Sequence, residues 1–149
     1  CRGHTMADFE EGYSRLRRLV PKAEVCVHVI FGLPGENDED MMNTVKKVAE
    51  LAPEQVKIHL LHVIKDTPLG DEYLRGDYIP LERERYISLV VEALKLLPPN
   101  TVICRLTGDG IAEDRLAPEY SKRKIAILND IDKLMFASGA TQGCNYKKN

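Results

Sequence analysis

The chain has 149 residues, of which 44% are hydrophobic and 30% are charged, with a formal net charge of −2. That length and apolar content predict one soluble domain with a sizeable core. The charge excludes a strongly basic surface that would attract nucleic acid. No apolar run approaches the roughly 18 residues that a membrane-spanning helix needs, and no signal peptide is visible, so we expect a cytoplasmic location and no membrane contact.

The four cysteines lie far apart, at positions 1, 26, 104 and 144. They form no zinc or iron–sulfur spacing, so the sequence predicts no metal site. A disulfide framework is not expected in a chain of this size, and we interpret the cysteines as buried or incidental thiols. The sequence begins at Cys1 and its first residues read like the interior of a protein, so we expect a fragment of a longer protein.

Helices and strands alternate along the chain. Apolar residues at helical spacing predict helices over 5–20, 38–51, 81–97 and 122–137. Short runs rich in β-branched residues predict strands over 24–31, 56–64 and 101–107. This order indicates parallel βαβ units, so the fold class is α/β. Three strands do not close a barrel, so they form either a small open sheet or part of a larger barrel.

Local signals set the ends of the helices. Thr5 followed by Asp8 has the spacing of a capping box, and Asn37 or the next residue caps the second helix. Gly139 suits the C-terminal cap of the last helix. The stretch with Pro68, Gly70 and Gly76 predicts a loop, and the stretch before the last helix is expected to be irregular.

Side chains alternate across a strand, so each predicted strand has one apolar and one mixed face. The apolar face of the first strand, expected under the helices, consists of Val25, Val27, Val29 and Phe31. The mixed faces carry Glu24, Cys26, His28 and Ile30 in the first strand, Lys57, His59, Leu61 and Val63 in the second, and Ile103, Arg105 and Thr107 in the third.

Two interpretations of the mixed face stay open. It is either the solvent-exposed face of an open sheet or the lumen of a barrel, where its residues meet a ligand. Parallel sheets are usually covered on both faces, which favours the lumen. Lys57 and Arg105 on this face either pair with Glu24 or hold an anionic substrate.

Binding sites in parallel α/β folds lie at the carboxyl ends of the strands. Three turns are expected at that end: GLPGE at 32–36, HVIKDT at 62–67 and TGDG at 107–110. Their common location favours a ligand site there. Asp109 is either a turn former or a ligand contact. His59 and His62 are not expected to form a metal site, because residues three apart on a strand point to opposite faces.

The stretch HVIFGLPGE, with His28, Ile30, Gly32 and Glu36, resembles the fifth-strand pattern G-x-I-x-G-x-x-x-E of radical SAM enzymes. Four further segments resemble one subgroup of this family, the YhcC-like iron–sulfur oxidoreductases. They are RGHT at 2–5, KIHLLHVIKDTPL at 57–69, RLTGDG at 105–110 and the closing segment 122–132. The resemblance covers nearly the whole chain. It implies the C-terminal half of a partial (β/α)6 TIM-like barrel over 1–98, and an extension over 99–149 that packs a strand and a helix on the barrel.

Enzymes of this family use a [4Fe–4S] cluster to cleave S-adenosylmethionine (SAM) reductively to a 5′-deoxyadenosyl radical. The resemblance implies that Arg2 pairs with the methionine carboxylate of SAM and that Ile30 lies against its adenine. The further SAM-site residues that it implies are His28 at the ribose, Gly32 and Gly35 at close backbone approaches, Glu36 ordering the turn, and the backbone of His62 and Val63 beside the adenine. The candidate substrate contacts are Lys57, His59, Arg105 and Asp109.

The C-x-x-x-C-x-x-C motif that holds the cluster in this family is absent from the sequence. We therefore expect a chain that supplies part of the SAM and substrate pocket of a longer enzyme, is inactive alone, and binds neither cofactor by itself. No catalytic residue is predicted. The alternative is a non-catalytic α/β domain that binds a ligand or another protein. The strand over 24–31 has a free edge in this arrangement, so we also expect self-association through it or a rearrangement of residues 1–20 that covers it.

Overall fold

The computed structural model describes residues 3, 5–108 and 113–147. The helices are α1 (Met6–Leu19), α2 (Asp38–Leu51), α3 (Pro68–Arg75), α4 (Arg83–Leu96) and α5 (Lys124–Ala137). The strands are β1 (Cys26–Phe31), β2 (Gln55–Leu60), β3 (Val63–Ile64), β4 (Val102–Arg105) and β5 (Arg115–Ala117), and a short 3₁₀ helix, η1, spans Glu119–Lys122.

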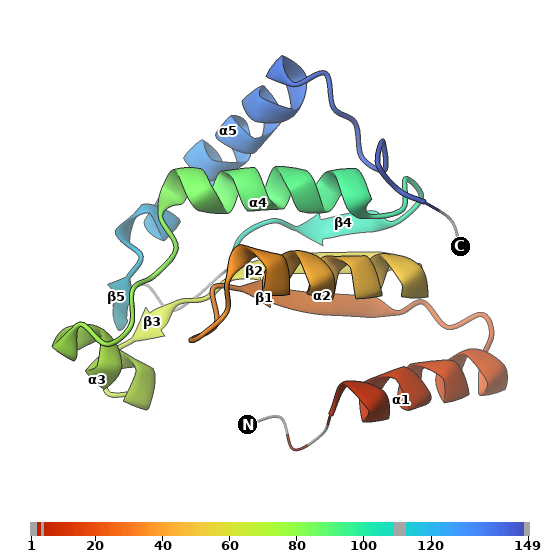
Figure 1. Ribbon diagram of the computed structural model, residues 1–149, viewed down its shortest axis with the longest axis horizontal. Helices are drawn as coiled ribbons and strands as arrows, with labels where there is room; N and C mark the ends of the chain where they lie inside the picture. Colours follow the sequence, from red (N-terminus) through yellow and green to blue (C-terminus); the bar gives the residue numbers. More distant parts are fainter. Residues whose placement is uncertain (1–2, 4, 109–112, 148–149) are drawn as a thin grey trace.

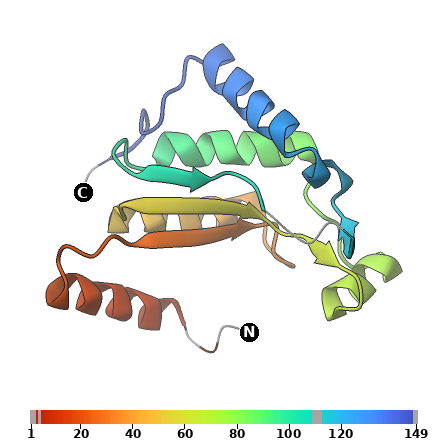
Figure 2. The same cartoon turned by 180° about the vertical axis from the view of Figure 1, so that it is seen from behind.

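A parallel sheet with the strand order β1–β2–β4 forms the centre of the fold. Helices α2 and α4 cover one face of this sheet, and α5 packs on α4 (Figure 1). No described helix lies over the opposite face, which is seen in front of the helices in Figure 2. The structure confirms the predicted α/β class, and it leaves one face of a parallel sheet open.

The core fills the space between the sheet and helices α2 and α4. Val27, Val29 and Phe31 of β1 are at most 7% exposed, and Val56 and Ile58 of β2 are fully buried. Burying a side chain of this size contributes about 1.5–3 kcal/mol. The prediction that the valines of the first strand lie beneath helices is therefore confirmed, and the residues between them face the other way.

Two capping boxes start the helices at the predicted places. Asp8 N donates to Thr5 Oγ1 at 3.2 Å, and Thr5 N donates to the Asp8 carboxylate at 2.6 Å. The same exchange joins Asn37 and Asp40, at 3.1 and 3.0 Å. Gly139, with a φ of +62°, follows the end of α5 as expected of a helix-terminating glycine.

The predicted strand over 56–64 is wrong in its second half. β2 ends at Leu60, and Val63 begins β3, which pairs antiparallel with Ala117 of β5 in a separate small sheet. Val63 is fully buried in a second apolar cluster that includes Tyr78 and Ala117. The run VKIHLLHVI carries no information about which of two sheets its residues join, so the sequence does not reveal the break.

The prediction that Ile103 and Arg105 share a strand face is also wrong. The pairing of β2 with β4 shifts between neighbouring positions, from Val56 opposite Ile103 to Lys57 opposite Arg105. A bulge of this kind adds one residue to a strand and changes which face the following side chains occupy. Ile103 packs against the core, whereas Arg105 lies on the open face beside Lys57.

The stretch predicted as a loop contains α3. Thr67 caps this helix by accepting from Gly70 N at 3.0 Å, Pro68 occupies its first turn, and Gly76 ends it with a φ of +82°. These are the usual positions of proline and glycine around a helix, so the prediction of a loop is wrong. A Cβ on Gly70 would lie 2.4 Å from the Ile64 carbonyl oxygen, so the close packing of α3 on β3 requires this glycine.

The stretch predicted as irregular before the last helix contains β5 and η1. These elements have three and four residues, which is too short for a periodic pattern to show.

Helix α1 lies beside β1, on the side of the sheet away from β4 (Figures 1 and 2). Among the described residues β1 pairs only with β2, so the edge of β1 that is remote from β2 has no strand partner. Self-association through this edge stays a prediction, and so does the division of the chain at residue 98.

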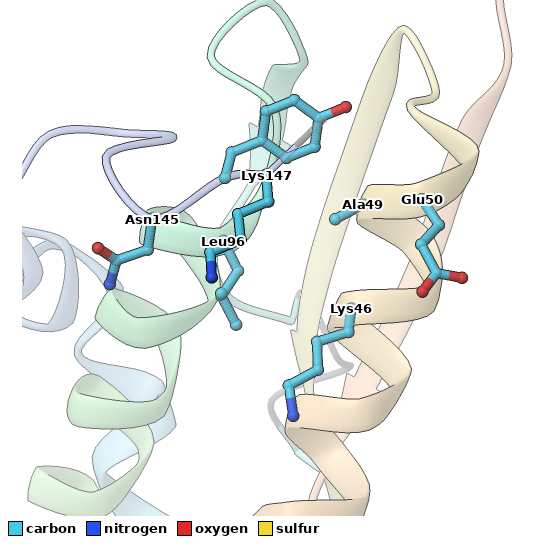
Figure 3. Close-up of a pocket in the computed structure, with 7 residues that line it drawn as sticks. Lys46, Ala49, Glu50, Leu96, Asn145 and Lys147 are labelled. Atoms are coloured by element: carbon cyan, nitrogen blue, oxygen red, sulfur yellow. The ribbon is translucent and has the colours of Figure 1, made fainter. Parts of the chain in front are cut away.

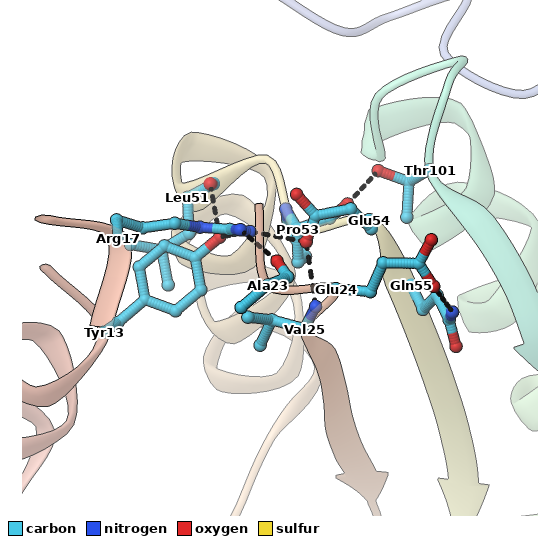
Figure 4. A network of polar contacts seen from close by, with 10 residues as sticks. All are labelled: Tyr13, Arg17, Ala23, Glu24, Val25, Leu51, Pro53, Glu54, Gln55 and Thr101. Atoms are coloured by element: carbon cyan, nitrogen blue, oxygen red, sulfur yellow. Dashed lines mark hydrogen bonds and ion pairs between the residues drawn. The ribbon is translucent and has the colours of Figure 1, made fainter. Parts of the chain in front are cut away.

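One ion pair anchors α1 at the amino ends of the strands (Figure 4). Arg17 donates to the Glu54 carboxylate and to the Tyr13 hydroxyl, both at 2.6 Å. It also donates to the Ala23 carbonyl at 2.8 Å, and the same Glu54 carboxylate accepts the Val25 N–H at 2.9 Å. The pair thus joins α1 to the starts of β1 and β2.

We expect Glu54 to titrate far below an ordinary glutamate. The hydrogen bond from Arg17, followed by that from the Val25 N–H, lowers the pKa of Glu54 to about 2. An unfolded-state glutamate has a pKa of about 4.3. Because the folded-state pKa is the lower one, the pair stabilises the fold above about pH 4.3, and this contribution is lost as the pH falls through about 2. The measurement is the carboxyl ¹³C shift of Glu54 against pH.

The control is Arg17→Met, which removes the largest cause of the shift and keeps an unbranched side chain. The pKa of Glu54 should then rise toward its ordinary value. A midpoint near pH 4 in the unaltered chain would contradict the anchoring role of this pair.

Candidate functional site

The carboxyl ends of β1, β2 and β4 lie at one edge of the parallel sheet, as the strand pairing requires. The turns that follow the second and third of these strands are in contact, because a Cβ on Gly108 would lie 2.7 Å from His62 Cε1 and 3.3 Å from the Leu60 carbonyl oxygen. Ile30, near the end of β1, is paired in register with His59 of β2. For the described residues, the prediction that the turns gather at one end is confirmed.

These ends enclose a hollow of about 290 Å³, which we call the strand-end hollow. It opens on the face of the sheet that α2 and α4 leave uncovered. The residues that line it are His28, Ile30, His59, Leu60, Leu61, His62 and Gly108. Four of these, His28, Ile30, His59 and His62, are candidates from the sequence. The lining comes from β1, the end of β2 and the turns after β2 and β4.

The wall of the strand-end hollow combines imidazole rings and apolar side chains. The rings of His28 and His59 are stacked, with centroids 5.2 Å apart and an interplanar angle of 24°. Ile30 is 43% exposed, while its neighbours Val29 and Phe31 are buried on the other face. The predicted orientation of His28 and Ile30, away from the helices, is confirmed. An exposed isoleucine beside stacked rings offers a flat, largely apolar surface.

Glu36 holds the turn after β1. Its carboxylate accepts the Leu33 N–H at 3.2 Å, and its own N–H donates to the Leu33 carbonyl at 3.1 Å. Burial raises the pKa of Glu36, and the charge of Asp40 raises it further, against the lowering effect of the Leu33 hydrogen bond. Gly35 in the same turn has a φ of +81° and open space around its Cβ position.

Gly32 is surrounded by protein side chains and not by the open space expected of a glycine that faces a ligand. Its φ is +88°, and a Cβ would lie 3.2 Å from Leu81 Cγ. Its carbonyl accepts the buried hydroxyl of Tyr78 at 2.7 Å. The backbone of Gly32 therefore meets Leu81 and Tyr78, which lie between α3 and α4, and only glycine fits this left-handed, closely packed position without strain.

Tyrosines hold two of the turns and the loop before α4, and the sequence did not indicate them. Tyr78 holds Gly32 after β1, Tyr86 donates to the Leu106 carbonyl after β4 at 2.8 Å, and Tyr120 donates to the Leu81 carbonyl at 2.8 Å. Burial raises the pKa of all three hydroxyls, so they remain protonated donors. Isolated tyrosines in loops and helices carry no spacing signal, and their partners are 20 to 46 residues away.

The remaining candidates are distributed as follows. Lys57 lies opposite His28 in register, and Arg105 lies opposite Lys57. Val63 belongs to β3 and is fully buried, so only its backbone is near the end of β2. Arg2 and Asp109 lie outside the described residues.

The structure bears on one alternative that the sequence left open. The Glu24 carboxylate accepts a hydrogen bond from Gln55 Nε2 at 3.1 Å. Lys57 forms no ion pair or hydrogen bond with any residue that the structure describes. Pairing of Lys57 with Glu24 is therefore not observed.

His59 and His62 both line the strand-end hollow, so the expectation that they point to opposite faces is wrong. The reason is that β2 ends at Leu60 and the chain turns before His62. Over residues 5–108 and 113–147, no group of three His, Cys, Asp or Glu side chains is placed to hold a metal ion. In the same described ranges, no helix is long and apolar enough to cross a membrane.

The thiols of the open face lie near its amino end. Cys104 Sγ donates to Gln55 Oε1 at 3.3 Å, and Gln55 is paired in register with Cys26. Burial, and then the neighbouring Cys104, raise the pKa of the Cys26 thiol. Cys26, Cys104 and Cys144 are free thiols.

A further hollow, of about 310 Å³, lies between α2, the end of α4 and the C-terminal segment (Figure 3). Its lining includes Lys46, Glu50, Leu96 and Lys147. It is on the helix side of the sheet and away from the carboxyl ends of the strands. We therefore take the strand-end hollow as the candidate functional site.

The chain matches the model of the Radical_SAM C-terminal domain family over residues 53–137. It is 38% identical to the uncharacterized protein YtqA of Bacillus subtilis over 147 residues, which cover 99% of this chain and 45% of YtqA. It is 26% identical to protein YhcC of Escherichia coli over 138 residues, or 93% of this chain and 44% of YhcC. Among solved structures it is similar to the archaeal Methanocaldococcus infernus Elp3 with an N-terminus deletion, with a TM-score of 0.75 and 22% identity over 95% of this chain and 33% of that one.

Fold and site together define an α/β domain with a parallel sheet, one open face and a hollow at the strand ends. The family match covers more than half of the sequence, and the chain belongs to the radical SAM C-terminal domain family. The predicted similarity to YhcC-like proteins and the predicted partial-barrel fold are confirmed. The chain spans less than half the length of YtqA and of YhcC.

We expect Gly108→Ala to disturb the strand-end hollow. The new methyl group would lie 2.7 Å from His62 Cε1, so the half-buried imidazole must move. Overpacking of this kind costs about 1–3 kcal/mol. The measurements are the unfolding midpoint and the NMR resonance of the His62 ring.

Gly12→Ala is the matched control, because Gly12 lies within α1 and its Cβ position is open. This change should stabilise the chain by about 0.5–1 kcal/mol and leave the His62 resonance in place. An unchanged His62 resonance in Gly108→Ala would show that the third turn does not contact the second.

Proposed function

We propose that this chain forms one wall of the SAM pocket of a radical SAM enzyme, and that the [4Fe–4S] cluster is held by a part of that enzyme outside the printed sequence. The observation that carries the proposal is the strand-end hollow, which lies on the open face of a parallel sheet at the carboxyl ends of its strands. Membership of the radical SAM C-terminal domain family supports the proposal.

The residues of the strand-end hollow fit a nucleoside. Ile30 and Leu61 offer apolar surface for an adenine, and the exposed His28 offers a ring nitrogen to a ribose hydroxyl. Gly108 lets the third turn pack closely against His62, which brings this turn to the edge of the hollow. The volume of about 290 Å³ is at the lower limit of ligand pockets, which occupy about 300–1,000 Å³. A hollow of this size suits part of a SAM molecule, as expected of one wall.

The residues present do not fit the cluster. Iron–sulfur clusters bind several thiolates, and the printed sequence has four widely spaced cysteines without the C-x-x-x-C-x-x-C motif. No suitable group of ligands occurs among the described residues either. We therefore assign the cluster to a region beyond this sequence, and we expect no SAM cleavage by this chain alone.

In such an enzyme, the cluster would supply the electron for the reductive cleavage of SAM. The part of this chain is to bind the adenine against Ile30, to orient the ribose at His28, and to exclude water from that side. The hydroxyls of Tyr78 and Tyr86 fix the turns after β1 and β4, which keeps the wall in place before the ligand arrives.

The proposal is tested with a chimera in which this chain replaces the matching 45% of YtqA. With dithionite and reconstituted iron, we expect the chimera to convert SAM to 5′-deoxyadenosine, with unaltered YtqA as the reference. Ile30→Asp should reduce this conversion by about tenfold or more, because a carboxylate would replace the apolar surface under the adenine. Ile125→Asp, at a 76% exposed position of α5, is the control and should leave the rate unchanged.

If Ile30→Asp and Ile125→Asp reduce the formation of 5′-deoxyadenosine equally, Ile30 has no particular role. An active chimera that is indifferent to Ile30→Asp would contradict the assignment of the strand-end hollow to SAM.

A further inference from the structure

Two free thiols lie on the open face of the sheet, on either side of β2. Cys26 is the first residue of β1 and alternates with the buried Val27, so its side chain is on the open face. Cys104 is the extra residue of the bulge in β4, between the positions opposite Val56 and Lys57, and it is exposed. We call Cys26 and Cys104 the thiol pair.

Gln55 of β2 lies between the two members of the thiol pair. Its side chain is on the open face, because the next residue, Val56, is fully buried on the other one. Gln55 is paired in register with Cys26, and its Oε1 accepts a hydrogen bond from Cys104 Sγ at 3.3 Å. Burial raises the pKa of Cys26, and Cys104 raises it further through its charge and a side-chain hydrogen bond. The two sulfur atoms are therefore neighbours.

The spacing of the strands is too wide for a disulfide within the thiol pair. Neighbouring strands are about 4.8 Å apart, so β1 and β4, with β2 between them, are about 9.5 Å apart. A disulfide joins Cα atoms that are about 4.4–6.8 Å apart. A metal ion between the sulfurs extends this reach by about 2.5 Å, because two metal–sulfur bonds of about 2.3 Å replace one sulfur–sulfur bond of about 2.05 Å. The thiol pair therefore suits a metal bridge.

The two ligands indicate which metal the bridge would hold. Thiolates are soft ligands that select Cu(I), an ion that two thiolates in a line can satisfy. A structural zinc site needs four ligands, and no third His, Cys, Asp or Glu joins the thiol pair within residues 5–108 and 113–147. Lys57 is close enough to Cys26 for its positive charge to favour the thiolate. This charge also suits the single negative charge of a Cu(I) ion held by two thiolates.

We propose that Cys26 and Cys104 form a binding site for one Cu(I) ion. On binding, two S–H bonds break, two Cu–S bonds form and two protons pass to the solvent, and no atom changes its oxidation state. Cys26 precedes His28 by two residues on the same face of β1, so the ion lies beside the strand-end hollow without lining it. The site does not rest on the function proposed above.

The test is an anaerobic titration of the reduced chain with Cu(I), in competition with the chromophoric chelator bicinchoninate. All proteins carry Cys1→Ser, because Cys1 lies outside the described residues. We expect one Cu(I) per chain. Cys26→Ser and Cys104→Ser should each weaken binding by about a hundredfold or more, since even the loss of an outer-sphere partner costs about 10–100-fold. Cys144→Ser is the matched control, because this exposed thiol follows α5, and it should leave the affinity unchanged.

The ligands are identified on the copper-loaded chain. X-ray absorption should show two sulfur neighbours of the copper. Cu(I) should also protect Cys26 and Cys104 from alkylation by iodoacetamide and leave Cys144 reactive.

The proposal would be overturned if Cys144→Ser weakened binding as much as Cys104→Ser, or if one copper ion were held between two chains. Displacement of the Cu(I) by an equal concentration of Zn²⁺ would overturn the choice of metal. Intact amide NMR spectra of the serine variants exclude misfolding as the cause of lost binding. Cys26→Ala serves as a second variant if Cys26→Ser misfolds.

Discussion

The site depends on the alternation of buried and exposed side chains along β1, whose buried face packs against helices α2 and α4. Val27, Val29 and Phe31 are buried in the core, so His28 and Ile30 have only the open face of the sheet to occupy. A shift of one residue would move every side chain of the strand to the other face, at a cost of several buried apolar groups. The orientation of the candidate ligand residues is therefore fixed by the hydrophobic core and not by contacts in the site.

The turns around the site are fixed in another way, by contacts between segments far apart in the sequence. The hydroxyls of Tyr78 and Tyr86 hold carbonyls after β1 and β4, and Gly108 lets the last turn pass close to His62. Each contact comes from α4, or from the segment before it, or from the neighbouring turn. The layer of helices thus both buries the core and sets the shape of the strand-end hollow, which links stability to the proposed binding role.

The parts of this structure that were predictable from sequence are those specified within one strand or one helix end. The two faces of β1 and the capping boxes at Thr5 and Asn37 depend on residues at most six positions apart. The break after Leu60 and the bulge opposite Lys57 depend on which strand pairs with which, and the pattern of one strand does not contain that information. The same reason explains why His62 was assigned to the wrong face and why the contacts of the tyrosines were not foreseen.

The central claim is that the open face beside Ile30 receives an adenine ring. The most direct measurement is the nuclear Overhauser effect between the adenine protons of S-adenosylhomocysteine and the methyl groups of this chain. The account predicts cross-peaks to the methyl groups of Ile30 and none to those of Val29, which lies one residue away on the buried face. Cross-peaks to methyl groups on the helix side of the sheet, without any to Ile30, would contradict the account.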